Sequence, residues 1–508
     1  MSSDNHQSTL RGTEDIVECS QGSNQISQLP KRSTAYEKER SNFLTWEGRH
    51  DPLNPRNWSK ARKWTTVIIV SLFTFNSHVI STMIAPALPY IGQDLHINTS
   101  FEQALVLSVF VAAYILGPLF WGPFSEVYGR IPVVQVSNAW LLCFNLGCGF
   151  AQNKQQILAF RFLAGVGGSA PQAIGAGLLG DLFIPEVRGR ALSIYSIAPL
   201  LGPAVGPILG GYITVSTTWR WIFYSTTISC GVVQASQLLF LRESYAPVLL
   251  HRKQKMMIEH TGNTSLYTEH DHLGRSFKHT IAIALTRPFR MLATHTIVQL
   301  LAVYLAYLYG MNYLILSSFP LLWSDIYHQS IGAQSLNYLS LGIGFCLGAQ
   351  ISAYLQDSIY MRLKRRYVVD GGPGRPEFRA PVIIPGAIIM PVGLLIYSWT
   401  AEAHTHWVGP NIGAAIYAAG AIISFQAVRG YLVDAYTTYA ASAIGAATIL
   451  QSIAGFGFPL FAPSMYKTLG FGKGGTLLAV CAIVIGWPSP LLLWIFGERL
   501  RARSLLEA

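Results

Sequence analysis

Charged residues are scarce in this chain: they make up 12 % of its 508 residues, about half the share that is usual in soluble globular proteins. The apolar set makes up 51 % instead. This composition excludes an ordinary globular enzyme with a charged surface. Cysteines are also few, six in all, and five of them fall in apolar runs. The sequence therefore argues against a disulfide framework, and no cysteines have the spacing of zinc ligands, so no metal site is expected.

The net charge is +11, but the basic residues stand in separate stretches that connect apolar runs. Such a distribution is typical of membrane topology rather than of a nucleic-acid-binding face. At this hydrophobicity, the 46 Gly and 26 Pro favour packed transmembrane helices over a low-complexity coil. The chain is thus expected to contact the lipid bilayer and no nucleic acid.

Apolar stretches of about 20 residues, the length that crosses a bilayer core, follow one another from Trp64 onward. They predict an all-α membrane protein with twelve transmembrane helices. We place the spans near residues 65–87, 104–121, 132–151, 157–179, 190–213, 219–241, 291–318, 331–355, 381–401, 410–429, 441–463 and 476–497. The first 60 residues are polar and contain no apolar segment of a signal peptide. They are interpreted as a solvated, disordered cytosolic tail.

Lys and Arg are distributed very unequally over the two sides that twelve spans define. The side of both termini carries 31 of them, and the other side only Lys154, Arg220, Lys467 and Lys473. By the positive-inside rule, both termini are cytosolic. The one basic residue placed inside a span is Arg161. The predicted parts are a tail (1–60), a first six-helix bundle (61–241), a central cytosolic loop (242–288), a second bundle (289–498) and a cytosolic end (499–508).

Two short cytosolic loops at equivalent places in the two halves carry an acid followed by a base. They hold Glu126 with Arg130, and Asp357 with Arg362. This is weak internal repetition of the kind found in two-fold transporters. Gly122 and Gly129 permit a tight turn around the first pair. We interpret these residues as conformational latches, so neutralising Glu126 is expected to cripple transport; a plain turn that sets the topology is the alternative.

The fifth span contains an unusual density of Gly and Pro. Isolated soluble helices do not tolerate such a run, but in a bilayer small residues let helices pack backbone to backbone. Generic small-residue packing is the alternative to a functional motif. The run consists of Gly202, Gly206, Pro207, Gly210 and Gly211.

Together these motifs resemble the major facilitator superfamily, and within it the fungal twelve-span drug:proton antiporters. The stretch from Gly122 to Arg130 is similar to the family's loop signature G-x-x-x-D-x-x-G-R, with Glu126 in the acidic place, and the run from Gly202 to Gly211 matches its antiporter signature. Arg161 matches the arginine of the fourth-helix motif. Ile131, Ser193 and Ala164 depart from the usual residues.

The resemblance implies two six-helix bundles around a cavity that opens alternately to either side. It also implies export of small amphipathic organic compounds, such as drugs, toxins or fungal secondary metabolites, in exchange for protons. No ATPase module and no catalytic constellation is apparent. The sequence therefore predicts a transporter rather than an enzyme, with a proton gradient as the energy source and no cofactor.

Three polar residues in the spans are candidates for coupling protons to substrate. Arg161 is costly inside a membrane, and its alternative role is a structural donor to backbone carbonyls. His78 titrates near neutral pH and Asn76 is its polar neighbour, although a lone intramembrane His also bridges helices. The proton carrier stays unassigned, with Glu126, Asp357 and His78 as candidates.

Aromatic and amide side chains of later spans are candidates for lining the cavity, since they accept flat amphipathic molecules by stacking and single hydrogen bonds. Interfacial tyrosines and amides that join helices are the alternatives. These candidates are Tyr309, Asn312, Tyr313 and Gln451. A separate site is the sequon at Asn98, which is expected outside the cell and open to glycosylation.

Two other functions stay open at this stage. One is a uniporter or proton-coupled nutrient symporter of the same superfamily, and the other is a membrane sensor that signals without moving solute. The default location is the plasma membrane, with the vacuolar membrane as the alternative, and a monomer is expected.

Overall fold

The apolar runs of the sequence form long helices that lie side by side. The computed structural model describes residues 42–47, 51–268, 277–367, 374–436 and 440–506. The first half contains η1 (Pro55–Asn57), α2 (Lys60–Thr82), η2 (Ala85–Ala87), α3 (Leu88–Asp94), α4 (Ser100–Ala112), η3 (Ala113–Ile115), α5 (Gly117–Val127), α6 (Arg130–Gly149), α7 (Lys154–Gly168), α8 (Ala170–Leu182), α9 (Pro185–Ser216) and α10 (Arg220–Phe240).

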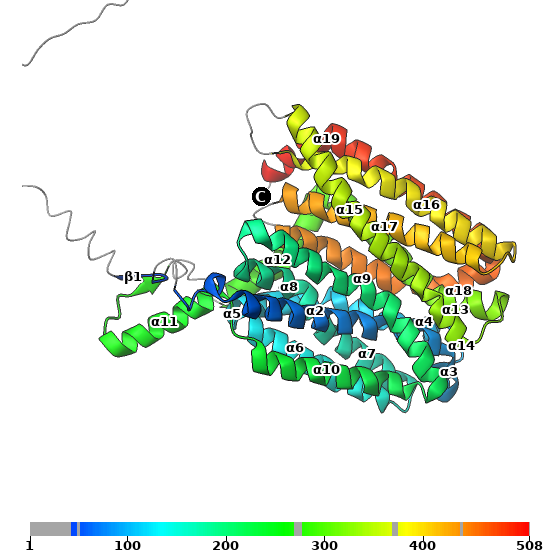
Figure 1. Ribbon diagram of the computed structural model, residues 1–508, viewed down its shortest axis with the longest axis horizontal. Helices are drawn as coiled ribbons and strands as arrows, with labels where there is room; N and C mark the ends of the chain where they lie inside the picture. Colours follow the sequence, from blue (N-terminus) through cyan, green and yellow to red (C-terminus); the bar gives the residue numbers. More distant parts are fainter. Residues whose placement is uncertain (1–41, 48–50, 269–276, 368–373, 437–439, 507–508) are drawn as a thin grey trace, which may run out of the picture.

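The second half follows a connecting segment that contains α11 (Ala246–Thr261). Its elements are α12 (Phe277–Thr294), α13 (Thr296–Leu321), η5 (Leu322–Ile326), α14 (Ile331–Leu336), α15 (Tyr338–Tyr367), η7 (Pro376–Arg379), α16 (Ala380–Glu402), α17 (Val408–Ala435), α18 (Ala440–Gly486) and α19 (Pro488–Leu506). The helices run roughly parallel to one long direction, with α11 at one end of the molecule and α3 and α14 at the other (Figure 1). We call these the α11 end and the α3 end.

Ten helical segments of the described residues are long and apolar enough to cross a membrane. The segment Ser442–Arg501 contains two crossings, because the backbone leaves the helix at Gly470 (φ 75°, ψ 173°). Gly470 lies beside Glu402, where α16 ends, and the same segment returns to Glu377 near the start of α16. The 21-residue α10 adds the twelfth crossing although its Ser, Thr and Gln lower its hydropathy. The predicted count of twelve is therefore confirmed.

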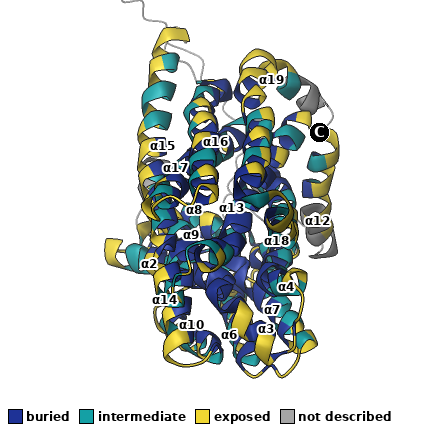
Figure 2. Cartoon of the chain, turned by 90° about the vertical axis from the view of Figure 1, so that its right-hand side faces the viewer, coloured by how far each residue is buried: buried dark blue, intermediate teal, exposed yellow. Residues whose placement is uncertain are grey.

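Each half is built on its own core. In the first half α2 packs on α9 and α10, and α6 packs on α7 and α10. In the second half α13 packs on α18, and α16 and α15 pack on α17, around one continuous apolar cluster. Buried residues fill the middle of the molecule, and exposed ones follow its outer sides (Figure 2). Many of the outer residues are large and apolar, such as Leu239 at 77 % exposure, as a lipid-facing surface requires.

Part of the predicted N-terminal tail is packed rather than solvated. Strand β1 (Phe43–Leu44) pairs in parallel with β2 (Tyr267–Thr268), which follows α11. Asp51 is buried, and its carboxylate lies 3.5 Å from the Lys253 ammonium group of α11. Buried polar pairs and strand pairing override the polar composition that predicted disorder. Residues 1–41 of the predicted tail lie outside the described residues.

Two helices continue beyond their predicted ends. α15 runs to Tyr367 rather than 355, and α17 runs to Ala435 rather than 429. Helical hydrogen bonding does not stop where the apolar run stops, because polar residues also form helices in water or in an internal cavity. The bounds of the five predicted parts stay predictions.

Candidate functional site

A cavity of about 280 Å³ lies between the two halves toward the α11 end. Its walls come from α5 and α8 of the first half and from α12, α17 and α18 of the second. Polar side chains on these walls include Glu126, Arg130, Gln172, Arg429 and Thr448. At the opposite end the halves meet directly, α9 against α14 and α15. The structure therefore has an internal space that is reached from one end.

Arg130 begins α6 at the edge of this cavity and holds several elements together. Its Nε lies 3.3 Å from the Asp181 carboxylate at the end of α8, and its Nη1 donates to Ser125 Oγ at 2.7 Å. The Glu243 carboxylate accepts the N–H groups of Arg130 and Ile131, which caps the start of α6. Gly129, at φ 100°, faces the same carboxylate where a Cβ would collide with it.

The second half repeats this arrangement with different residues. Arg379, next to the start of α16, donates from Nε to the Asp434 carboxylate of α17 at 2.5 Å and from Nη1 to Gln356 at 2.8 Å. Each arginine stacks on a tyrosine ring, at 4.5 Å from Tyr245 and 5.4 Å from Tyr360. Burial raises the pKa of the Tyr245 hydroxyl, so that ring stays neutral beside its arginine. The two halves therefore repeat an arginine–aspartate pair beside a tyrosine ring, and the repeated pairs are Arg130 with Asp181 and Arg379 with Asp434.

The latch pairs expected from the sequence do not form in the structure. Within its described residues, no ion pair joins Glu126 to Arg130 or Asp357 to Arg362. Glu126 is exposed on the cavity wall, and Asp357 and Arg362 are exposed on α15. The acids that hold the arginines, Asp181 and Asp434, come from helices that are distant in the sequence. Gly122 lies on the cavity wall with open space around it.

Neutralising Asp181 is therefore expected to harm transport more than neutralising Glu126. Asp181→Asn leaves the half-buried Arg130 without its carboxylate, and removing one partner of such a pair costs about 3–5 kcal/mol in fully buried cases and less here. We expect at least about a tenfold loss of transport for Asp181→Asn and less than about a twofold loss for Glu126→Gln, measured per molecule at the membrane. Equal losses of transport in both variants would contradict this expectation and show that Glu126 is as important for transport as Asp181.

The glycines of α9 bring this helix against two neighbours. A Cβ on Gly202 would meet the Cβ of His78, and a Cβ on Gly206 or Gly210 would meet backbone atoms of Val79 or Met83. These three glycines therefore fix α9 to α2 inside the first half. Gly211 differs, because it meets the side chain of Ser335 in α14, across the boundary between the halves. Pro207 lies within α9, and the helix continues through it to Ser216.

Arg161 is fully buried and joins three helices. Its guanidinium donates to the carbonyl oxygens of Ile80 and Ser81 in α2 at 2.8 and 3.1 Å, and to those of Val106 and Leu107 in α4 at 3.3 and 3.4 Å. It also stacks on the Phe110 ring at 4.6 Å. Every nitrogen of the guanidinium is thus used for backbone contacts. These contacts favour the structural alternative that the sequence left open, and a coupling role for Arg161 stays a prediction.

His78 and Asn76 lie on different sides of α2. The His78 ring bonds through Nδ1 to the Thr74 carbonyl at 2.8 Å and through Nε2 to Gln172 at 2.8 Å. Gln172 lines the cavity, so His78 is one side chain away from it. Asn76 instead accepts a hydrogen bond from Ser229 of α10 at 3.0 Å and has no place on the cavity wall. Their coupling roles stay predictions, with His78 better placed.

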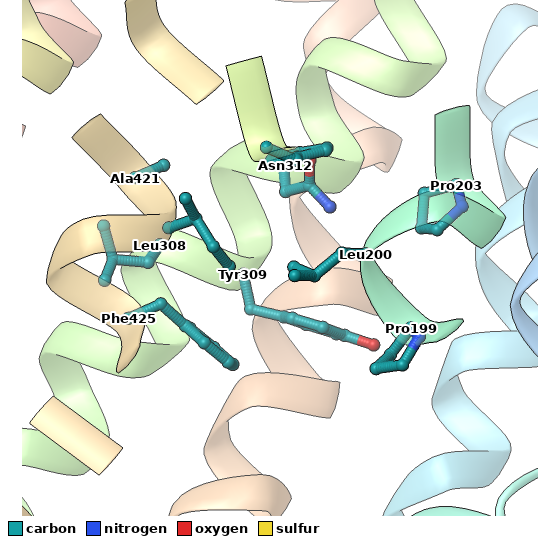
Figure 3. A pocket seen from close by; sticks show the side chains of 10 residues that line it. Pro199, Leu200, Pro203, Leu308, Tyr309, Asn312, Ala421 and Phe425 are labelled. Carbon is teal, nitrogen blue, oxygen red and sulfur yellow. The ribbon is translucent and has the colours of Figure 1, made fainter. Parts of the chain in front are cut away.

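A second, smaller pocket, of about 80 Å³, lies between α9 and the helices α13, α15 and α17. Leu308, Tyr309 and Asn312 of α13 point into it opposite Pro199 and Pro203, with Phe425 beside them (Figure 3). Two of the predicted lining residues, Tyr309 and Asn312, therefore reach a pocket. Tyr313 instead lies 3.2 Å from Ser81 Oγ, hydroxyl to hydroxyl, and Gln451 is buried in α18 outside both pockets.

Sequence reasoning missed Arg429 as a site residue because it counted this last residue of the predicted span 410–429 with the loop 429–440 that follows. The structure places it in α17 on the cavity wall, so Arg161 is not the sole basic residue within a span. The available signal was the apolar run that continues from Tyr431 to Val433 beyond it. Asn98 is exposed between α3 and α4, and its glycosylation stays a prediction.

Comparison with known proteins places the chain among transporters. The sequence model of the Major Facilitator Superfamily matches residues 70–459. The efflux pump vrtL of Penicillium aethiopicum is 45 % identical, covering 99 % of this chain and 98 % of that protein. The MFS-type transporter oryF of Aspergillus oryzae is 42 % identical, covering 89 % of this chain and 92 % of that protein.

Solved structures show the same fold at low sequence identity. The xylose transporter XylE from E. coli, in a partially occluded inward open conformation, aligns with a TM-score of 0.61 at 15 % identity, covering 86 % of this chain and 98 % of that chain. The match to the family extends over most of the sequence, and the helices have the expected twelve-span arrangement. The chain is therefore a multi-pass membrane transporter that belongs to the Major Facilitator Superfamily.

Proposed function

We propose that this protein exports small organic compounds from the cytosol in exchange for protons. The observation that carries the proposal is the cavity between the halves, which is reached from the α11 end and blocked at the α3 end. Such a space binds a solute from one side only, as alternating access requires. Two observations support export as the direction: relatives of this chain are named efflux pumps, and α9 of this chain carries the glycine motif.

The α11 end is assigned to the cytosol by charge. The connecting segment, the end of α15 and the end of α19 all lie on the side where 31 Lys and Arg were counted. Anionic lipids and the positive-inside rule favour this side as cytosolic. In this orientation the cavity faces the compartment from which an exporter collects its substrate, most simply across the plasma membrane.

The proposed cycle moves the two halves against each other. The Arg130 and Arg379 contacts lie within the halves, so each half moves as a unit. In the alternate state α5 and α8 approach α17 and α18, while α9 separates from α14. Proton binding and substrate binding favour different states, and this difference couples the gradient to export. His78, joined to the cavity through Gln172, is the proposed proton-accepting side chain.

Export is tested in a pump-deficient yeast that expresses the full chain. Cells are loaded with a panel of antifungals and fungal metabolites, and their content is measured with and without a protonophore. We expect lower accumulation of some compounds, and we expect the protonophore to abolish the difference. A His78→Gln variant that keeps full protonophore-sensitive export would exclude His78 as the proton site.

The two rival functions give other outcomes in the same assay. Higher accumulation that depends on the proton gradient would indicate a symporter, and accumulation that is raised without such dependence would indicate a uniporter. An unchanged content across the whole panel, with the protein present in the membrane, would contradict export and favour a sensor.

A further inference from the structure

Arg429 is a cation on the cavity wall with no anionic partner among the described residues. It lies on α17, at the last residue of the predicted span, and its guanidinium stacks on the Phe425 ring at 5.1 Å. Its Nε is buried and has no hydrogen-bond partner among the described residues. No carboxylate of the described part of the chain lies within ion-pair distance of it. An unpaired cation in a low-dielectric site is costly and favours binding of an anion.

The other arginine of the cavity does not offer the same site. Arg130 is already held by the Asp181 carboxylate, the Ser125 hydroxyl and the Tyr245 ring. Glu126 shares the wall but is exposed to solvent, where its charge is screened. Among the described residues, Arg429 is thus the cation of this cavity that no carboxylate holds.

Apolar surface lies next to this cation on the same face of α17. Phe425 is one helical turn away, and it also lines the second pocket together with Leu308 and Tyr309. Residues four apart on a helix are separated by about 6 Å along its axis. The Arg429 guanidinium and the Phe425 ring therefore present a cation and an apolar surface next to each other, which suits a molecule with an acidic group beside an aromatic or apolar body.

We infer that Arg429 binds the acidic group of the transported compounds, so that the preferred substrates are amphipathic organic acids, such as aromatic carboxylates or acidic phenols. The planar guanidinium presents a pair of parallel donors to a carboxylate, and Phe425 and Tyr309 contact the apolar body. This inference rests on the proposed export function and specifies its substrate class. It also gives the exposed Glu126 no part in substrate binding.

Matched acids and esters test this inference in the yeast export assay. The probes are 2-naphthoic acid with methyl 2-naphthoate, and orsellinic acid with methyl orsellinate, added to the antifungal panel. The variants are Arg429→Gln, Arg429→Lys and, as a control for the loss of one positive charge, Arg365→Gln, which lies exposed on α15 away from the cavity. The amount of each variant at the membrane is measured in parallel.

We expect the wild type to export the acids at least about tenfold better than their esters, and Arg429→Gln to remove this preference. Arg429→Lys should keep part of it, because the charge remains but the paired donors are lost. Arg365→Gln should behave as the wild type. These results would support the inference.

Three results would overturn it, and they can be told apart. If the wild type exports only neutral or cationic compounds, the export function stands and the acid preference is wrong. If Arg429→Gln reduces acids and esters equally, Arg429 acts in the conformational change, for example by pairing with Glu126 when the cavity closes. If the wild type exports nothing in the panel, the proposed function itself fails.

Discussion

Replacing Gly210 by valine is expected to leave less than about a tenth of the wild-type amount of protein at the membrane. A Cβ at this position would fall on the carbonyl of Met83, a backbone atom that cannot rotate away. α9 would have to move off α2 along the whole face that Gly202 and Gly206 also hold. Overpacking of this kind costs about 1–3 kcal/mol in soluble cores and more against a fixed backbone.

The matched control is Gly231→Val in α10. This glycine also lies in a span, but the nearest atom to an added Cβ is Leu142 Cδ1 at 3.8 Å, an ordinary contact. Surface amounts by immunoblot and thermal stability in detergent should therefore stay near wild type. If Gly210→Val and Gly231→Val gave the same amount of folded protein, the glycine motif of α9 would not be required for close packing of α9 on α2.

Gly211 allows a sharper distinction between folding and function. Its steric neighbour is the side chain of Ser335 in the other half, so Gly211→Ala should fold but hinder closure at the α3 end. Adding Ser335→Gly removes the colliding atoms and should restore export. A double variant as inactive as Gly211→Ala would show that the defect lies elsewhere.

Replacing Arg161 by leucine is expected to lower the thermal stability of the purified protein by about 5 °C or more. The substitution removes donors to four backbone carbonyls in α2 and α4, and a hydrogen bond from a charged group is worth about 1.5–3 kcal/mol. Arg161→Lys should restore little of the loss, because an ammonium cannot reach carbonyls on two helices as the planar guanidinium does.

Stability separates the two roles that Arg161 could have. As a structural residue, its loss lowers the unfolding temperature and export together. As a coupling residue, its loss would leave the unfolding temperature unchanged and make the remaining export insensitive to a protonophore. Measuring both quantities on Arg161→Leu, with Arg365→Gln as a neutral control, decides between them.

The spans could be predicted from the sequence because a bilayer forces every backbone group into helical hydrogen bonds, so hydropathy and length suffice. The partners of charged residues could not. Sequence reasoning paired Arg130 with Glu126 because the two residues are close in the sequence. In the structure the carboxylate beside Arg130 belongs to Asp181, at the end of α8. The place of Arg429 on the cavity wall could not be predicted for a related reason. In the sequence, a charged residue at the end of an apolar run looks like a loop residue, and only the structure shows the cavity beside it.

The contact between Gly211 and Ser335 is nearly flush, since a hydrogen atom on one side meets a hydroxymethyl group on the other. Interlocked side chains must change rotamers before two surfaces part, and each such change adds a barrier. Two surfaces whose side chains do not interlock can separate without such rotamer changes. At this contact, therefore, α9 and α14 can separate without a change of side-chain rotamer, whereas elsewhere the opening must also break the Ser81–Tyr313 hydrogen bond between α2 and α13.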